Sequence, residues 1–222
     1  MIKAVIFDMD NTLMDRHEGL KLFAADQYRR RFAGLAQVTE AAYMERFVVL
    51  DNNGRLWKDI VYQQLVAEFN LPSVSWETLL DEYVSLFRNF CHPLPGLHKM
   101  IATFQQQNIK LAVITNGPYP FQRHNFEAMG ITDAFEFVMV SEQEGLRKPD
   151  PAIFQRALNR LGLQPHEAVY VGDNPIADVQ GAHSASMKAV FRPSVHWDAC
   201  PTADATCENL ADLPQIIQSL ND

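Results

Sequence analysis

The sequence predicts an α/β protein: a three-layer, Rossmann-like core with a parallel sheet between helices, and a helical domain inserted into it. The chain opens with the short apolar run Ala4-Val5-Ile6-Phe7, which is typical of a buried strand. A purely helical pattern follows from about residue 15 to residue 89. From residue 97 onward, helical and strand-like segments alternate, which implies parallel strands with helices on both faces of the sheet.

The first strand has no partner near it in the sequence, so it must join the sheet formed by the later strands. We therefore predict a discontinuous core, residues 1–14 and 93–222, and a helical domain over residues 15–92. Within the insert, Leu20, Phe23 and Tyr28 fall on one helical face, and no strand-like run is present. The segment His92-Pro93-Leu94-Pro95-Gly96 ends this pattern, because two prolines and a glycine interrupt a helix.

The remaining core elements follow from apolar periodicity and from the turn residues between them. We expect strands at residues 110–115, 135–140, 168–171 and 188–191. We expect helices at residues 97–107, 120–129, 151–161 and 176–184. Open parallel sheets bind ligands at the carboxyl ends of their strands, so functional side chains should lie there.

Composition and charge restrict the class of ligand. The 222 residues carry a formal net charge of −8, which opposes broad binding to nucleic acid or to an anionic membrane. No apolar run reaches the roughly 18 residues of a membrane span, and the first strand begins where a signal peptide would lie. The three scattered cysteines form neither a disulfide framework nor a metal-binding pair. We expect a cytoplasmic protein, a monomer or homodimer, that acts on a small molecule.

Charged or hydrogen-bonding side chains follow the first strand and the next three strands of the predicted sheet. In chain order they are Asp8 and Asp10, then Thr115-Asn116-Gly117, then Lys148, and finally Asp173 with Asn174 and, about one turn further on, Asp178. The glycine of the second group is small enough for main-chain N–H groups to approach an anion. The pattern therefore combines carboxylates, a hydroxyl and a cation.

The carboxylates cannot all stay ionised side by side, because like charges a few ångströms apart repel strongly in a partly buried site. A divalent cation relieves this repulsion, and oxygen ligands favour Mg²⁺, which completes its coordination with water and phosphate. Lys148, Thr115 and the glycine-turn amides then suit a phosphoryl group. One carboxylate can attack phosphorus, and a second can protonate the leaving alkoxide and then activate water.

Each of these signals alone has an ordinary explanation. Asp-x-Asp also occurs in sugar-nucleotide transferases and in calcium loops, although Leu13 stands where an EF-hand loop needs glycine. Thr115-Asn116-Gly117 could be a plain turn, and Lys148 a surface lysine. Asp173 and Asp178 could be a helix cap and a solvated acid. Because they occur together, in order, at the ends of successive strands, they jointly predict one functional site.

With this order, the chain resembles the haloacid dehalogenase-like (HAD) hydrolase superfamily over essentially its whole length. The four matching stretches are Asp8-Met9-Asp10-Asn11-Thr12-Leu13, Ile114-Thr115-Asn116-Gly117, Lys148-Pro149-Asp150 and Gly172-Asp173-Asn174-Pro175-Ile176-Ala177-Asp178. The resemblance implies that Asp8 is the catalytic nucleophile and a Mg²⁺ ligand. It implies that Asp10 is the general acid and base and binds Mg²⁺ through its main-chain carbonyl.

The same resemblance gives roles to the other motif residues. Thr115 and Asn116, with Gly117, would hold the phosphoryl oxygens, and Lys148 would neutralise the nucleophile and the phosphate. Asp173 would bind Mg²⁺ through its carboxylate. The supporting residues, next to Lys148 or the waters of the metal, would be Asp178 and Asn174.

The resemblance also implies that the helical insert is a cap that closes over the site and selects the substrate. The candidates for substrate contact in the insert are Arg16, His17, Asn53, Arg55 and Trp57. Each has an alternative interpretation, such as solvation at a hinge for Arg16 and His17 or core packing for Trp57.

Residue types separate the reactions that this superfamily performs. Asp10 argues against a dehalogenase, which needs no acid for a halide leaving group. The expected activity is that of a Mg²⁺-dependent phosphatase acting on a small metabolite such as a sugar phosphate, a nucleoside monophosphate or phosphoglycolate. A phosphomutase, which Arg55 keeps open, and a catalytically silent binding module are the alternatives.

Overall fold

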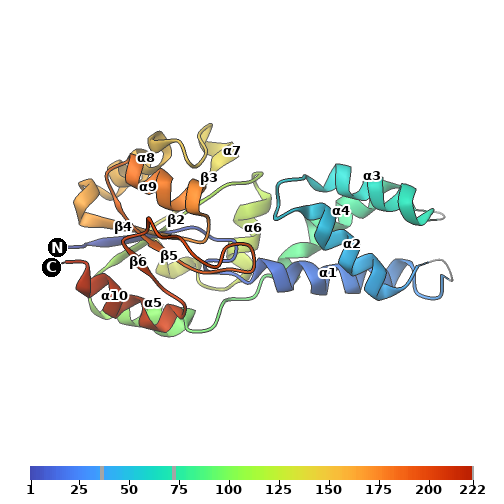
Figure 1. Ribbon diagram of the computed structural model, residues 1–222, viewed down its shortest axis with the longest axis horizontal. Coiled ribbons are helices and arrows are strands. Elements are labelled where there is room, and N and C mark those ends of the chain that lie inside the picture. Colours follow the sequence, from blue (N-terminus) through green and yellow to red (C-terminus); the bar gives the residue numbers. More distant parts are fainter. Residues whose placement is uncertain (36–37, 72–73, 222) are drawn as a thin grey trace. The chain divides into compact units, whose positions relative to one another are not determined.

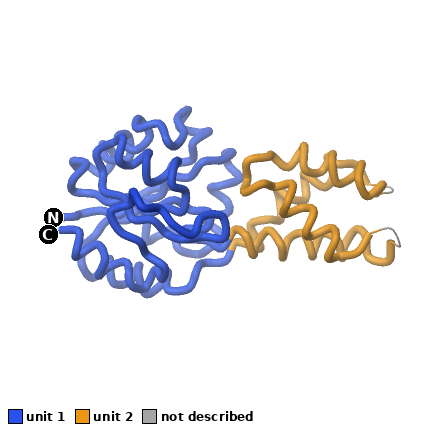
Figure 2. Tube along the Cα trace, viewed as in Figure 1, with its two compact units in different colours: residues 1–15, 92–222 blue, residues 16–91 orange. Residues whose placement is uncertain are grey.

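The computed structural model describes residues 1–35, 38–71 and 74–221. The chain forms two compact units, one of residues Met1–Asp15 with His92–Asp222 and one of residues Arg16–Cys91 (Figure 2). Within the first unit, the two segments that lead to and from the second unit are hydrogen-bonded to each other. The N–H of Asp15 donates to the carbonyl of His92 at 3.1 Å, and the N–H of Leu94 donates to the carbonyl of Leu13 at 2.8 Å.

The first unit contains one sheet of six strands in the order β3-β2-β1-β4-β5-β6. All neighbouring strands are parallel, and Phe7 of the central strand β1 lies level with Val113 and Val171 on either side. The strands are β1 (Ala4–Phe7), β2 (Lys110–Thr115), β3 (Val138–Val140), β4 (Ala168–Gly172), β5 (Lys188–Phe191) and β6 (Ala205–Thr206). The predicted α/β class and parallel sheet are confirmed.

Helices cover both faces of the sheet, with α8 and α9 on one side and α5 and α10 on the other (Figure 1). Side chains alternate between the faces of a strand: Ile6 joins a buried cluster with Phe154 and Leu158 of α8, whereas Phe7 meets Phe135 edge-on at 6.2 Å. The helices of this unit are α5 (Leu97–Gln106), α6 (Phe121–Ala128), α7 (Ser141–Glu144), α8 (Pro151–Leu161), α9 (Gly181–Ser184) and α10 (Leu213–Ser219).

The second unit is helical, with α1 (Arg16–Arg31), α2 (Glu40–Asp51), α3 (Lys58–Phe69) and α4 (Trp76–Leu86). Its core is aromatic, because the buried ring of Phe23 meets Tyr83 at 5.3 Å and Phe47 at 6.3 Å. Side chains at the first turns complete two helix starts: Thr39 accepts from the N–H of Ala42, and Ser75 from that of Thr78. Among the residues described in either unit, no helix combines the length and apolarity needed to cross a membrane.

Several core elements differ from the sequence-based expectation. The strand expected over residues 135–140 is confined to β3, and a 3₁₀ turn at Thr132–Ala134 lies before it. The helix expected over residues 176–184 is divided into a π-helical turn, Pro175–Gln180, and α9. The short elements β6 and α7 were not expected, because two or four residues are too few to show a period. The helix α10 was not expected either.

Candidate active site

The carboxyl ends of three adjacent strands bring predicted site residues to one edge of the sheet. Asp8 follows β1, Thr115 ends β2, and Asp173 follows β4, and all three are buried. The N–H of Asp8 donates to the carbonyl of Val171 in β4 at 2.8 Å, which fixes the nucleophile candidate on the sheet. The strand order reverses direction at β1, and such a switch point is where open parallel sheets bind ligands.

The ammonium group of Lys148 lies at the centre of the site. Its Nζ donates to Asp8 Oδ1 at 2.6 Å, to Asp178 Oδ1 at 2.7 Å and to the hydroxyl of Tyr170 at 2.8 Å. An ammonium group has three donors, so these contacts use all of them. The side chain of Asn116 holds the main chain of Lys148, donating to its carbonyl at 2.9 Å and accepting from its N–H at 3.0 Å.

Asp178 is fixed by the loop that follows β4. Its Oδ2 accepts the N–H of Asn174 at 2.9 Å. The Oδ1 of Asn174 in turn accepts the N–H groups of Ile176 at 3.0 Å and Ala177 at 2.9 Å, and so begins the π-helical turn. A Cβ on Gly172 would lie 2.3 Å from Asp178 Cγ, so the carboxylate can sit here only against a glycine.

Negative charge exceeds positive charge in this cluster. Asp8, Asp173 and Asp178 offer oxygens that all lie within 4.8 Å of one another. Burial raises the pKa of Asp8 well above its ordinary value; the Lys148 ammonium opposes this, and the neighbouring carboxylates add to it. Burial alone would lower the pKa of Lys148, but Asp178 and Asp8 outweigh it and raise that pKa, so the ammonium stays charged.

The oxygens of the cluster fit a hard cation. Among the described residues, Asp173 Oδ2 is buried without a hydrogen-bond partner. Both oxygens of Asp178 accept short hydrogen bonds, from Lys148 Nζ and from the N–H of Asn174, whereas Asp8 Oδ2 accepts a longer contact of 3.3 Å from the hydroxyl of Thr12. Oxygen-only ligands of this kind suit Mg²⁺. Asp8 and Asp173 are therefore the side chains best placed to bind it, and Asp178 supports the lysine.

Protons and metal ions should compete for Asp173. Burial, followed by the charge of Asp178, raises the pKa of Asp173 to about 7. This pKa exceeds the ordinary value of 3.8, so the metal-free protein should lose stability as the pH rises between these values. We expect the apparent Mg²⁺ affinity to rise about tenfold for each pH unit up to about pH 7, because metal ligands must be deprotonated.

Calorimetric titration of the metal-free protein with Mg²⁺ at a series of pH values measures this effect. Asp173→Asn is the comparison, because it keeps the shape of the side chain and removes its titration. An affinity of the unmodified protein that stays constant below neutral pH would contradict the assignment of Asp173 as a ligand.

Beyond the loop that follows β2, helix α6 contributes a residue that lies outside the four motifs. Gln122, on α6, is buried, and its Nε2 donates to Asp10 Oδ2 and to Thr115 Oγ1, both at 2.8 Å. A Cβ on Gly117 would lie 2.6 Å from Gln122 Cγ, so the glycine makes room for the glutamine. No sequence signal identifies this residue, because a glutamine on a helix is most often exposed.

The phosphate contacts expected from this loop stay predictions. The hydroxyl of Thr115 accepts a hydrogen bond from Gln122, which leaves its own proton for an acceptor such as a phosphoryl oxygen. The side chain of Asn116 is bound to the main chain of Lys148. The N–H of Gly117 donates to Ser141 Oγ at 3.0 Å.

The five candidates for substrate contact in the helical unit have different surroundings, and their role also stays a prediction. Arg16 is buried, and two of its N–H groups donate to the carboxylate of Asp51, both at 2.8 Å. Trp57 packs edge-on against Tyr83, with ring centroids 6.2 Å apart. The other candidates are His17 and Asn53, which are half-buried, and Arg55, which is exposed.

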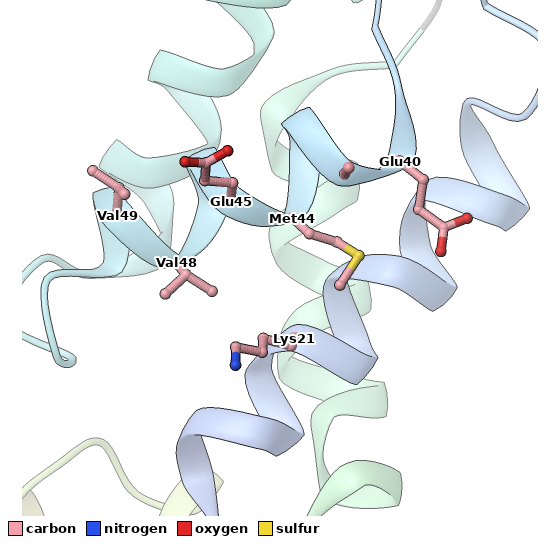
Figure 3. Close-up of a pocket in the computed structure, with 7 residues that line it drawn as sticks. Lys21, Glu40, Met44, Glu45, Val48 and Val49 are labelled. Atoms are coloured by element: carbon pink, nitrogen blue, oxygen red, sulfur yellow. The ribbon is translucent and has the colours of Figure 1, made fainter. Parts of the chain in front are cut away.

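The helical unit also has a hollow of about 550 Å³ between α1 and α2 (Figure 3). Apolar side chains of Met44, Val48 and Val49 line it, together with Lys21. None of the predicted catalytic or metal-binding residues lines it. Its apolar walls do not suit phosphate, so this hollow is not the active site.

The fold and the site together define a Rossmann-like hydrolase with an aspartate after its central strand and a buried lysine beside it. The chain belongs to the haloacid dehalogenase-like hydrolase family, whose model matches residues 5–191.

Individual relatives agree with this family. The chain is 32% identical over 216 residues, 92% of this chain and 90% of the relative, to a glyceraldehyde 3-phosphate phosphatase of Methanopyrus kandleri. A crystal structure of a HAD phosphatase from Thermococcus onnurineus matches with a TM-score of 0.69 and 28% identity, covering 97% of this chain and 98% of that one. A putative beta-phosphoglucomutase from Thermotoga maritima, at 22% identity and a TM-score of 0.76, covers 98% of this chain and 99% of its own and shares the fold.

Proposed function

We propose that this phosphomonoesterase depends on Mg²⁺ and hydrolyses a small phosphorylated metabolite through an aspartyl-phosphate on Asp8. The observation that carries the proposal is the contact of Lys148 with Asp8 and Asp178, next to the unpartnered oxygen of Asp173. This arrangement combines a carboxylate nucleophile, a fixed positive charge and an available metal ligand. The phosphatase relative from Methanopyrus kandleri, named for glyceraldehyde 3-phosphate, supports a small substrate.

Each residue has a separate task in this mechanism. Asp8 attacks phosphorus, and Lys148 neutralises the negative charge of nucleophile and phosphate while Asp178 positions the ammonium. Asp10 protonates the leaving alkoxide and then takes a proton from the water that hydrolyses the aspartyl-phosphate. The hydroxyl of Thr115 donates to a phosphoryl oxygen. Mg²⁺ held by Asp8, Asp173 and the carbonyl of Asp10 would add positive charge next to the phosphoryl group.

In this proposal the helical unit, residues 15–92, is a cap domain that selects the substrate. Arg16, His17 and Arg55 are its proposed substrate contacts, and Asn116 and Gly117 complete phosphate binding in the core. The acidic net charge of −8 supports a small anionic substrate held by local cations rather than a nucleic acid or a membrane. A cytoplasmic location and a monomeric or homodimeric state belong to the same proposal.

Metal removal tests the proposal directly. With Mg²⁺, the protein should release phosphate from p-nitrophenyl phosphate, and EDTA should lower the rate about a hundredfold or more, because metal ions stabilise the transition state by several kcal/mol. Restored Mg²⁺ should restore the rate. Phosphate release that continues unchanged in EDTA would contradict the proposed metal dependence.

A phosphomutase of the same fold is the second candidate. The observation that favours it is Arg55, whose exposed side chain in the loop between α2 and α3 suits a second contact with a sugar phosphate. Incubation with a hexose 1-phosphate, followed by ³¹P NMR, separates the two activities. A phosphatase produces inorganic phosphate, whereas a mutase produces an isomeric sugar phosphate.

A further inference from the structure

Gln122 connects two side chains that the proposed reaction uses for different purposes. Its Nε2 donates to Asp10 Oδ2 and to Thr115 Oγ1, each at 2.8 Å. A primary amide nitrogen has two hydrogens, so these two short contacts use both. At the other end of the amide, Asn125 Nδ2 donates to Gln122 Oε1 at 3.4 Å, which agrees with the nitrogen facing the carboxylate.

The first consequence concerns Asp10. The carbonyl oxygen of a carboxylic acid accepts an N–H better than its hydroxyl oxygen does, so the bond from Gln122 to Oδ2 favours a proton of Asp10 on Oδ1. The same bond restrains rotation of the carboxyl group. Gln122 thereby selects the oxygen of Asp10 that exchanges protons with the substrate.

The second consequence concerns Thr115. A hydroxyl that accepts one hydrogen bond still has its own proton to donate. Because Oγ1 accepts from Gln122, that proton is directed away from the glutamine. It is then available for a phosphoryl oxygen, as the proposed function requires.

Burial makes these contacts difficult to replace with water. Gln122 is only 3% exposed, and Thr115 only 1%. Gly117 allows the close approach, because a Cβ there would lie 2.6 Å from Gln122 Cγ and 3.0 Å from its Cδ. A variant without the amide would therefore leave the buried hydroxyl of Thr115 without this donor rather than with a solvent substitute, and it would remove the N–H that holds Oδ2 of the half-buried Asp10.

We propose that Gln122 is a positioning residue that aims the proton-exchanging oxygen of Asp10 and the hydroxyl proton of Thr115 at the same phosphate ester. This inference rests on the proposed function, because it assumes that Asp10 protonates the leaving group. It concerns the departure of the alcohol, whereas Asp8 and Lys148 act on phosphorus.

Two substrates with different leaving groups test the inference. Glycerol phosphate needs protonation of its alkoxide, whereas p-nitrophenyl phosphate releases a stable phenolate. We expect Gln122→Met, which keeps the length of the side chain, to lower kcat about a hundredfold for glycerol phosphate and about tenfold or less for p-nitrophenyl phosphate. The inhibition constant of inorganic phosphate should rise, because the Thr115 hydroxyl is no longer oriented.

Three further variants make the result specific. Gln155→Met, at an exposed glutamine of α8, is the control for replacing a glutamine by methionine, and it should leave kcat unchanged for both substrates. Gln122→Asn, which keeps the amide but shortens its reach, should show the same selectivity with a smaller loss, and it replaces the methionine variant if that one does not fold. In the Asp10→Asn background, Gln122→Met should lose its preference between the substrates, because coupled residues are not additive.

Equal losses on both substrates, or no loss on either, would overturn the role of Gln122. The proposed function fails separately, if the unmodified protein releases no phosphate with Mg²⁺. It also fails in part if Asp10→Asn itself does not discriminate between the two leaving groups. An active enzyme with a selective Asp10→Asn variant but a non-selective Gln122→Met variant would refute only the inference about Gln122.

Discussion

Asp8→Asn is expected to abolish turnover and to leave the fold intact. The amide cannot attack phosphorus, so kcat should fall at least about a thousandfold, as is usual when a nucleophile is removed. The amide oxygen can still accept the bond that Lys148 now gives to Asp8 Oδ1 at 2.6 Å. Removing one of the crowded carboxylates should not lower the stability of the metal-free protein, because burial and the neighbouring acids already raise the pKa of Asp8.

Trapping of the covalent intermediate measures the chemistry separately from the rate. Acid quenching of the unmodified enzyme during turnover of a radiolabelled substrate should leave phosphate bound to the protein, and hydroxylamine should release it. Asp8→Asn should retain no label. Asp133→Asn, at an exposed acid of the same unit, is the control and should retain it. Label that persists on Asp8→Asn would assign the nucleophile to another residue.

The convergence of the motif residues was predictable from the sequence for a simple physical reason. Side chains that follow parallel strands must meet at one edge of the sheet, so the strand ends of β1, β2 and β4 place Asp8, Thr115 and Asp173 together. The strand runs themselves are apolar and β-branched, as in Lys110–Thr115, and buried almost throughout. Local pattern and global fold agree at these positions.

The contacts that depend on tertiary packing were not predictable. Gln122 and Gln155 both lie on helices of the core, and their local sequences do not reveal that the first is buried against Asp10 and the second is exposed. The two hydrogen bonds between the side chain of Asn116 and the main chain of Lys148 likewise depend on a loop that is far away in the sequence. Both residues contact partners whose positions are set by the sheet rather than by neighbours in the chain.

Lys148→Met is expected to have the largest effect on stability. The ammonium is buried and donates to Asp8 and Asp178, so its removal leaves two buried carboxylates without their counter-charge. Breaking a buried ion pair by removing one partner typically costs about 3–5 kcal/mol in free energy of unfolding. Turnover should be lost as well, because the fixed charge next to the nucleophile is gone. Urea denaturation of the metal-free protein measures the change.

The loss in free energy of unfolding caused by Lys148→Met should depend on pH and should be larger at higher pH. Burial already raises the pKa of Asp8, and without the opposing ammonium this pKa should rise further above that of the unfolded chain, so the folded variant binds more protons than the unfolded one. Stability therefore falls as the pH rises, and the loss relative to the unmodified protein should be larger at about pH 8 than at about pH 5. The control is Lys110→Met, at an exposed lysine of β2, which should change stability little at either pH. A loss that is the same at both pH values would mean that the carboxylates are not the groups that Lys148 stabilises, and the electrostatic basis of the site would have to be revised.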